Sequence, residues 1–340
     1  MILVWGSLAD SPVAAVTTAL EESEEEFLVL DQRESLETEI DLLVDAKVRG
    51  VLRHGGVEVD LESIRGIYLR PYDLSRLQVC AWEVERARVA ALNETLLAWS
   101  EVTPARVVNR PSAMASNHSK PFQSALIHAQ GFDVPRTLLT TDPDAVEAFW
   151  EHHGQIIYKS ISGVRSIVSR LTPKHRERFA SLPNCPTQFQ EWIEGVDIRV
   201  HVVGDDVFAS RVESIATDYR YPQTEAEQPK IEAFDLPSDL VERCWRLMAS
   251  LSLELAGIDL RLTDDGRWFC FEVNPSPGFT YYEQATGQPI ARSIARLLAR
   301  TDNVTVTRRL VADELSMARL QSADDLPVLG SVDSFHPEHC

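Results

Sequence analysis

Residues 257–278, GIDLRLTDDGRWFCFEVNPSPG, place several acidic side chains on two short apolar strands. The strand-like runs are Ile258–Leu262 and Trp268–Val273. Between them stands Asp265-Gly266, a dipeptide that favours a two-residue hairpin turn. The segment therefore predicts an antiparallel hairpin in which alternate side chains share a face.

The predicted register brings two carboxylates together. With Asp264 facing Arg267, counting back places Asp259 directly opposite Glu272, and Asn274 shares a face with Glu272. Like charges directly opposite each other destabilise a ladder, whereas two carboxylates and an amide oxygen suit a hard cation such as Mg²⁺. The hairpin therefore predicts a metal site, and the alternative is a solvated hairpin whose acids face water.

Other segments stand upstream in an order that resembles the ATP-grasp superfamily, whose signature is an acid on one strand and E-x-N on the next. Lys120 opens a helical run, and Lys159 lies in an apolar strand. The sequence QFQEWIEGVDIR at Gln188–Arg199 resembles the adenine- and ribose-binding hinge. The resemblance covers about residues 117–299 and is nearest to the branch of peptide-tailing glutamate ligases and graspetide synthetases, which make ester or amide crosslinks.

The resemblance implies a chain of α/β and α+β parts with the ATP-grasp fold. In this interpretation the chain begins with a pre-ATP-grasp α/β domain, which a small lid subdomain follows. A larger α+β subdomain with the metal site comes next, and the chain ends in a tail that is partly helical or disordered. We place the strand Gln188–Ile193 in the larger subdomain and one helix, Arg308–Leu320, in the tail. The expected boundaries are 1–110, 111–185, 186–301 and 302–340.

The resemblance also implies a nucleotide site. Lysines suit phosphates because they are flexible point charges, and a lysine within an apolar strand otherwise lacks a reason to be there. The hinge backbone would read the adenine edge, and a carboxylate accepts from ribose hydroxyls. The alternative for the hinge acids is that they are polar strand ends. The expected nucleotide-binding residues are Lys120, Lys159, Glu191, Trp192, Ile193 and Asp197.

Three arginines are candidates to stabilise a transferred phosphate or to hold a substrate carboxylate, because guanidinium binds such anions bidentately. They are Arg199, Arg211 and Arg261, the first two on adjacent arms of one predicted hairpin. Arg70, at the end of a predicted strand, is a further candidate for gripping an anion in a cleft, although an arginine there is more often a surface residue.

Composition narrows the partners. The formal charge of −19 argues against nucleic acid, which is bound through Lys and Arg. The five cysteines are scattered and lack metal-type spacing, which is typical of reduced thiols in a cytosol. Because no apolar run approaches the length of a membrane span and the first residues do not resemble a leader, we expect a cytoplasmic protein without membrane contact.

The function that these features predict is an ATP- and Mg²⁺-dependent ligase, with Mn²⁺ as an alternative metal, that forms an amide or ester through an acyl phosphate. The polar segment Asp218–Glu232 favours a peptide substrate, and the turn Ser160–Ser166 is a weak candidate for closing over phosphates. Two alternatives stay open: a ligase of free amino acids or small molecules, and a non-catalytic ATP-binding protein. The sequence leaves open whether the chain is a monomer or a homodimer.

Overall fold

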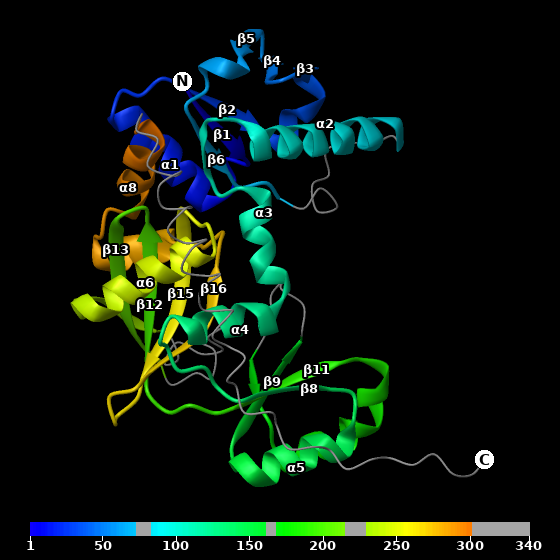
Figure 1. Cartoon of the computed structure of the whole chain (residues 1–340), viewed down its shortest axis with the longest axis vertical. Helices are drawn as coiled ribbons and strands as arrows, with labels where there is room; N and C mark the ends of the chain where they lie inside the picture. Colours follow the sequence, from blue (N-terminus) through cyan, green and yellow to red (C-terminus); the bar gives the residue numbers. More distant parts are fainter. Residues whose placement is uncertain (73–82, 161–167, 215–228, 301–340) are drawn as a thin grey trace. The chain divides into compact units, whose positions relative to one another are not determined.

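The computed structural model describes residues 1–72, 83–160, 168–214 and 229–300 (Figure 1). The chain divides into two compact units, Met1–Asp302 and Asn303–Cys340. The second unit, with the predicted tail helix Arg308–Leu320, lies outside the described residues. No described helix combines the length and apolar composition that crossing a bilayer requires.

The first sheet is parallel and has the strand order β2-β1-β6-β7. Its strands are apolar on both faces, as expected for a sheet covered on both sides. Helices α1 and α8 share one buried cluster with it, and α2 shares another (Figure 1). A Cβ on Gly66 of β6 would lie 2.4 Å from the Leu298 carbonyl oxygen, so this glycine lets α8 approach the sheet. The elements are β1 (Ile2–Gly6), α1 (Ser11–Glu22), β2 (Phe27–Asp31), β6 (Gly66–Leu69), α2 (Glu83–Val102), β7 (Arg106–Val108) and α8 (Ile290–Ala299).

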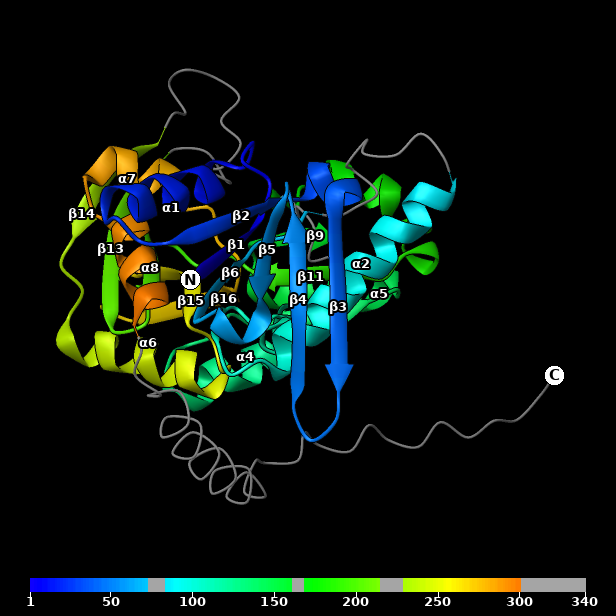
Figure 2. The same cartoon turned by 90° about the horizontal axis from the view of Figure 1, so that it is seen from above.

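A small antiparallel sheet, β3-β4-β5, shares the buried cluster of α2 (Figure 2). It comprises β3 (Thr38–Val44), β4 (Val48–His54) and β5 (Val57–Asp60). The polar–apolar alternation of β3 stops at its last three residues, of which Leu43 and Val44 are exposed.

The third sheet has the strand order β10-β9-β11-β8 and is called the lid sheet below, after the predicted lid subdomain. Its β11 lies outside the boundary predicted at residue 185, because it pairs with β8 and β9 rather than with the larger sheet. The pairing buries Phe189 of β11 in one cluster with Val146 and Ile156, which explains the difference. The elements are β8 (Thr137–Thr140), α5 (Pro143–His153), β9 (Ile156–Ser160), β10 (Ser169–Arg170) and β11 (Thr187–Glu191).

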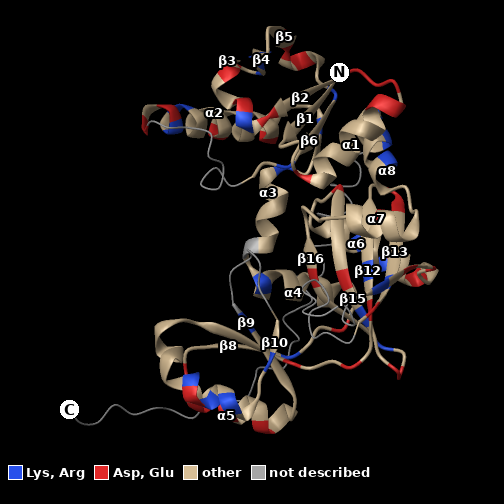
Figure 3. Ribbon diagram, turned by 180° about the vertical axis from the view of Figure 1, so that it is seen from behind, with Lys and Arg blue, Asp and Glu red and all other residues tan. Residues whose placement is uncertain are grey.

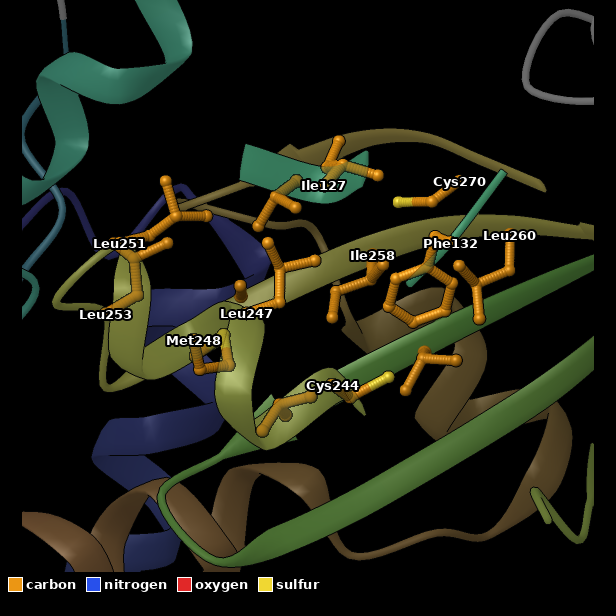
Figure 4. Packing of buried hydrophobic residues seen from close by; sticks show 14 of the residues in the cluster. Ile127, Phe132, Cys244, Leu247, Met248, Leu251, Leu253, Ile258, Leu260 and Cys270 are labelled. Atoms are coloured by element: carbon orange, nitrogen blue, oxygen red, sulfur yellow. The ribbon is translucent and has the colours of Figure 1, made fainter. Parts of the chain in front are cut away.

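The fourth sheet is antiparallel, with the order β14-β13-β12-β15-β16. One of its faces packs against α6 and α4, and Ile258, Leu260 and Cys270 of the sheet meet Cys244 and Leu247 of α6 there (Figure 4). The opposite face carries the charged residues described below. The elements are α3 (Pro111–Met114), α4 (Lys120–Ala129), β12 (Val196–Val203), β13 (Asp206–Glu213), β14 (Lys230–Phe234), α6 (Ser238–Ser250), β15 (Leu255–Leu262), β16 (Trp268–Asn274) and α7 (Thr280–Thr286).

The hairpin of β15 and β16 has the predicted pairing of Asp259 with Glu272, but not the predicted turn. Leu262 pairs with Trp268, so the connection spans five residues, from 263 to 267, instead of two. A bulge at Phe271 adds one residue to β16 and restores the register at Asp259. The longer turn and the bulge offset each other.

Candidate active site

The two predicted metal-binding carboxylates lie side by side on this hairpin. Asp259 and Glu272 are cross-strand partners whose side chains are 24% and 25% exposed. Arg199 of β12 lies directly opposite Asp259 and binds it, and Lys120 Nζ of α4 lies 3.1 Å from Glu272 Oε2. Figure 3 shows that acidic and basic residues occur along the neighbouring elements β12, β15, β16 and α4. Two ion pairs therefore offset the repulsion between the two acids.

Arg199 is almost completely buried, with 7% of its surface exposed. Gly257, two residues before Asp259 on the same face of β15, makes room for it. A Cβ on Gly257 would lie 2.0 Å from Arg199 Nη2. A glycine inside a strand is a known signal for such a close approach, yet the sequence analysis did not predict this role.

Helix α4 is fixed beside β16 by a buried glutamine. Gln123, 1% exposed, donates from Nε2 to the Val273 oxygen at 2.8 Å and accepts from the Val273 nitrogen at 3.0 Å. Lys120 stands one turn earlier on α4, where its Nζ also donates to Asn117 Oδ1 at 3.1 Å. The position of Lys120 beside Glu272 therefore depends on Gln123, a residue that the sequence pattern did not single out.

Asn274 completes the predicted ligand set on the same face as Glu272. Its Oδ1 accepts a hydrogen bond from the Ser276 nitrogen at 3.0 Å. An amide oxygen has a second lone pair, so this bond leaves Asn274 able to bind a cation. No group of three or more His, Cys, Asp or Glu side chains could hold a metal within the described part of the chain. A cation at this hairpin would therefore rely on Asp259, Glu272 and the amide, all hard oxygen donors that fit Mg²⁺.

The predicted adenine-reading backbone is partly used by the chain itself. The Glu191 nitrogen donates to the Arg136 oxygen at 3.0 Å, and the Trp192 nitrogen donates to the Gln155 oxygen at 2.9 Å. Ile193 is buried, and its N–H has no acceptor among the residues that the structure describes. Of the three backbone N–H groups predicted to contact adenine, only that of Ile193 is therefore left without an acceptor among the described residues.

Arg261 lies at the hinge and not at the acidic pair, although it shares a face with Asp259. It stands directly opposite Asp197, and its Nε donates to Asp197 Oδ1 at 2.8 Å. Its Nη1 donates to the Ile193 oxygen at 2.7 Å, and its guanidinium lies 5.1 Å from the Trp192 ring centroid. The structure therefore joins Arg261, Asp197, Ile193 and Trp192 into one cluster.

Lys159 lies in β9 of the lid sheet, as predicted, and is only 8% exposed. Its cross-strand partner is Gln188 of β11. Gln188 is 4% exposed, and its Oε1 has no hydrogen-bond partner among the described residues. A buried acceptor without a hydrogen-bond partner is rare in protein interiors. Gln188 Oε1 is therefore a polar group that a ligand could contact in this part of the lid sheet.

Arg211 is not brought to the acidic pair. In β13 it is the neighbour of Ser210, which lies opposite Arg199, so alternation places Arg211 on the other face of the sheet. There it pairs with Glu213, at 2.9 Å from Nε to Oε1. Arg199 and Arg211 do lie on adjacent arms of one hairpin, as predicted, but their side chains lie on opposite faces of the sheet.

His201, which the sequence analysis did not select, is fully buried next to Arg199. Its Nε2 lies 3.3 Å from the Gly278 oxygen and 3.4 Å from Arg199 Nε. Burial, and then the positive charge of Arg199, hold the pKa of His201 well below 6.5. The ring is therefore neutral at neutral pH.

Two predicted segments fall largely outside the described residues. They are the turn Ser160–Ser166, of which 161–166 are not described, and the polar segment Asp218–Glu232, of which 218–228 are not described.

The chain is similar in sequence and fold to known proteins. Residues 116–298 match the family model of the RimK-like ATP-grasp domain. A probable alpha-L-glutamate ligase of Shewanella loihica is 28% identical over 206 residues, which cover 57% of this chain and 67% of that ligase.

Two solved structures are similar over most of the chain. The ATP-grasp ligase PsnB, complexed with minimal precursor, Mg and ADP, is 30% identical with a TM-score of 0.69, covering 88% of this chain and 96% of that one. The same ligase has been solved with precursor peptide PsnA2 and AMPPNP. The macrocyclase MdnC of Microcystis aeruginosa, bound with precursor peptide MdnA, has a TM-score of 0.74 at 20% identity, covering 88% and 99% of the two chains, which shows the fold alone.

Proposed function

The chain belongs to the RimK-like ATP-grasp family and is an ATP-dependent ligase, and on this premise we propose that it joins a peptide carboxyl group to an amine or a hydroxyl. The observation that carries the proposal is the acidic pair Asp259 and Glu272. The two carboxylates share one sheet face, and each forms an ion pair with a basic side chain, Arg199 or Lys120. Such a face offers ligands for a metal and counter-ions for phosphates at the same place.

The reaction requires two steps. The γ-phosphoryl group of ATP passes to a substrate carboxylate, which gives ADP and an acyl phosphate. The amine or hydroxyl then attacks the acyl carbon: the new C–N or C–O bond forms, the bond to the phosphate oxygen breaks, and the nucleophile loses its proton. Positioning and charge neutralisation supply most of the catalysis in phosphoryl transfer, and we assign these tasks to Lys120, Lys159 and Arg199.

The remaining residues bind and orient. Ile193 N–H is the candidate adenine contact, and Trp192 and Glu191 shape the hinge around it. Asp197 is the candidate for ribose, held in place by Arg261. Asp259, Glu272 and Asn274 would hold Mg²⁺ or Mn²⁺, which when bound neutralises phosphate charge. Arg211 has no part in this assignment because it lies on the other face.

One observation favours a peptide over a free amino acid as the substrate. The solved ligase at 30% identity was complexed with its minimal precursor, and the similarity extends over 88% of this chain. A ligase of free amino acids or small molecules remains the second candidate, because the site residues bind ATP in the same way for either substrate.

The test is ADP release and product mass with ATP, Mg²⁺ and either short peptides rich in acidic, hydroxyl and lysine residues or free amino acids. Loss of one water per bond in a peptide identifies crosslinking, and gain of an amino-acid residue identifies tailing. Product formed from free amino acids alone would favour the second candidate. Tight ATP binding with no turnover in any mixture would contradict the proposed function.

A further inference from the structure

The segment that follows the metal-binding strand is held by side chains from distant parts of the chain. Residues 275–278 directly follow Asn274 and have no regular secondary structure. Side chains bind three carbonyl oxygens here, those of Pro275, Pro277 and Gly278. At Ser276, side chains bind the backbone nitrogen and the hydroxyl instead. The contacts are Asn109 Nδ2 to Pro275 O at 2.6 Å, Asn274 Oδ1 to Ser276 N at 3.0 Å, Arg70 Nη1 to Ser276 Oγ and to Pro277 O at 2.9 Å each, and His201 Nε2 to Gly278 O at 3.3 Å.

Two of these side chains come from the first sheet. Arg70 directly follows β6, and Asn109 directly follows β7. The two strands are parallel neighbours, so their carboxyl ends lie at one edge of the sheet. Ligands usually bind at such an edge, whereas here it binds another part of the same chain.

Both side chains are fixed. Asn109 is 2% exposed, and its Oδ1 also accepts from the backbone nitrogens of Glu254 and Leu255 at the start of β15. Arg70 has a side chain that is 15% exposed, and its Nε donates to Asp10. Asp10 thus orients the guanidinium and neutralises its charge, which makes Arg70 a poor grip for a substrate carboxylate.

We propose that Arg70 is a positioning residue for the ligase reaction: it fixes the backbone of residues 275–278, and through it Asn274, instead of binding the substrate. Only the expected effect of Arg70 on the rate of the ligase reaction rests on the proposed function; its effect on the backbone of residues 275–278 does not. Lysine cannot replace arginine in this role, because one ammonium group cannot reach Asp10, Ser276 and Pro277 in the fixed fork geometry of guanidinium.

The experiment compares Arg70→Lys with Arg65→Lys in the full-length protein. Arg65 directly precedes β6, whereas Arg70 directly follows it. Arg65 also forms an ion pair with one carboxylate, that of Glu25, and is therefore a matched control at the opposite end of the strand. Hydrogen exchange at the backbone N–H groups of Ser276, Gly278 and Phe279 should become faster in Arg70→Lys and stay at the wild-type rate in Arg65→Lys; Pro277 has no N–H to exchange. With an active peptide, kcat should fall about ten- to a hundredfold while the KM values for ATP and peptide change little.

Unchanged exchange in Arg70→Lys would overturn the inference, and so would a raised KM for the peptide with unchanged kcat, which would identify a substrate grip. If Arg70→Lys does not fold, Asp10→Asn tests the same point, because it removes the carboxylate that orients Arg70 and should also speed exchange at the same N–H groups. Failure of the wild-type protein to use any peptide would contradict the proposed function, whereas the exchange comparison would still decide the role of Arg70.

Discussion

Gln123 hydrogen-bonds both backbone polar groups of Val273, the residue between Glu272 and Asn274. β16 is the last strand of its sheet, and an edge strand leaves such groups without a partner. A single buried side chain therefore satisfies the sheet edge at Val273 and ties the helix that carries Lys120 to the strand that carries Glu272.

We expect Gln123→Leu to lower the free energy of unfolding by about 2–4 kcal/mol, because two buried bonds are lost and two backbone groups are left unsatisfied. Denaturant titration measures this change. ATP affinity should fall as well, since α4 positions Lys120. Gln130→Leu, at the C-terminal end of the same helix, is the control. Wild-type stability in Gln123→Leu would show that the two bonds do not matter.

Glu272→Gln should abolish ADP formation and leave the fold intact. The substitution keeps the volume of the side chain but removes one negative charge from the predicted metal ligands. An ADP-release assay and circular dichroism report the two effects, and Glu213→Gln on β13 serves as the control. Near-wild-type ADP release from a natively folded Glu272→Gln would refute the assignment of Glu272 as a ligand.

Lys159→Ala should weaken nucleotide binding more than Lys120→Ala does. Lys159 is 8% exposed, and a partly desolvated charge contributes more to binding an anion than one nearer to water. Calorimetric titration with a non-hydrolysable ATP analogue should show a difference of about tenfold in Kd, or roughly 1.4 kcal/mol. Equal affinity of the wild type and Lys159→Ala would exclude this role.

The contact between Gly257 and Arg199 gives a prediction about additivity. Gly257→Ala should reduce ADP formation about as much as Arg199→Lys does, because the added methyl group displaces the guanidinium. The double variant should be no worse than either single variant, since both remove the same interaction. Losses that add in the double variant would mean that Gly257 acts independently of Arg199.

His201 predicts a pH dependence of stability. Its pKa in the folded protein lies below 6.5, so the unfolded chain binds the proton more readily and stability falls as the pH falls below that value. Between about pH 7.5 and 5.5 the wild type should lose about 1 kcal/mol more than His201→Gln, whose amide does not titrate. Identical pH dependence of the free energy of unfolding in both proteins would contradict this prediction.

Alternation along strands predicted the acidic pair correctly. The pairing of Asp259 with Glu272 survived a wrong turn prediction because burying the other face of the hairpin requires this register, and the bulge at Phe271 absorbs the difference. The two lysines were likewise found at the elements where the sequence placed them, Lys120 at the start of a helix and Lys159 within a strand.

Contacts between residues far apart in the chain could not be predicted in the same way. Nothing local to Gly257 indicates that Arg199 needs the space, and nothing local to Arg70 indicates that it binds residues 276–277. The membership of β11 in the lid sheet depends on packing of Phe189 in a core that the sequence pattern alone does not reveal. The separation of Arg211 from Arg199 depends on the hairpin register, in which Ser210 rather than Arg211 stands opposite Arg199.

The two ion pairs on the acidic face have a consequence for how ligands enter. In the protein alone, Lys120 and Arg199 serve as counter-ions of Glu272 and Asp259. A nucleotide without a divalent cation would strip the carboxylates of their partners, and a cation without a nucleotide would do the same to the basic groups. If nucleotide and cation bind together, the cation would pair with the two carboxylates and the phosphates would pair with Lys120 and Arg199, so that every charged group keeps a partner of opposite charge. Each should therefore raise the affinity of the other by the same factor, so that the protein discriminates against free nucleotide and free metal and selects their complex.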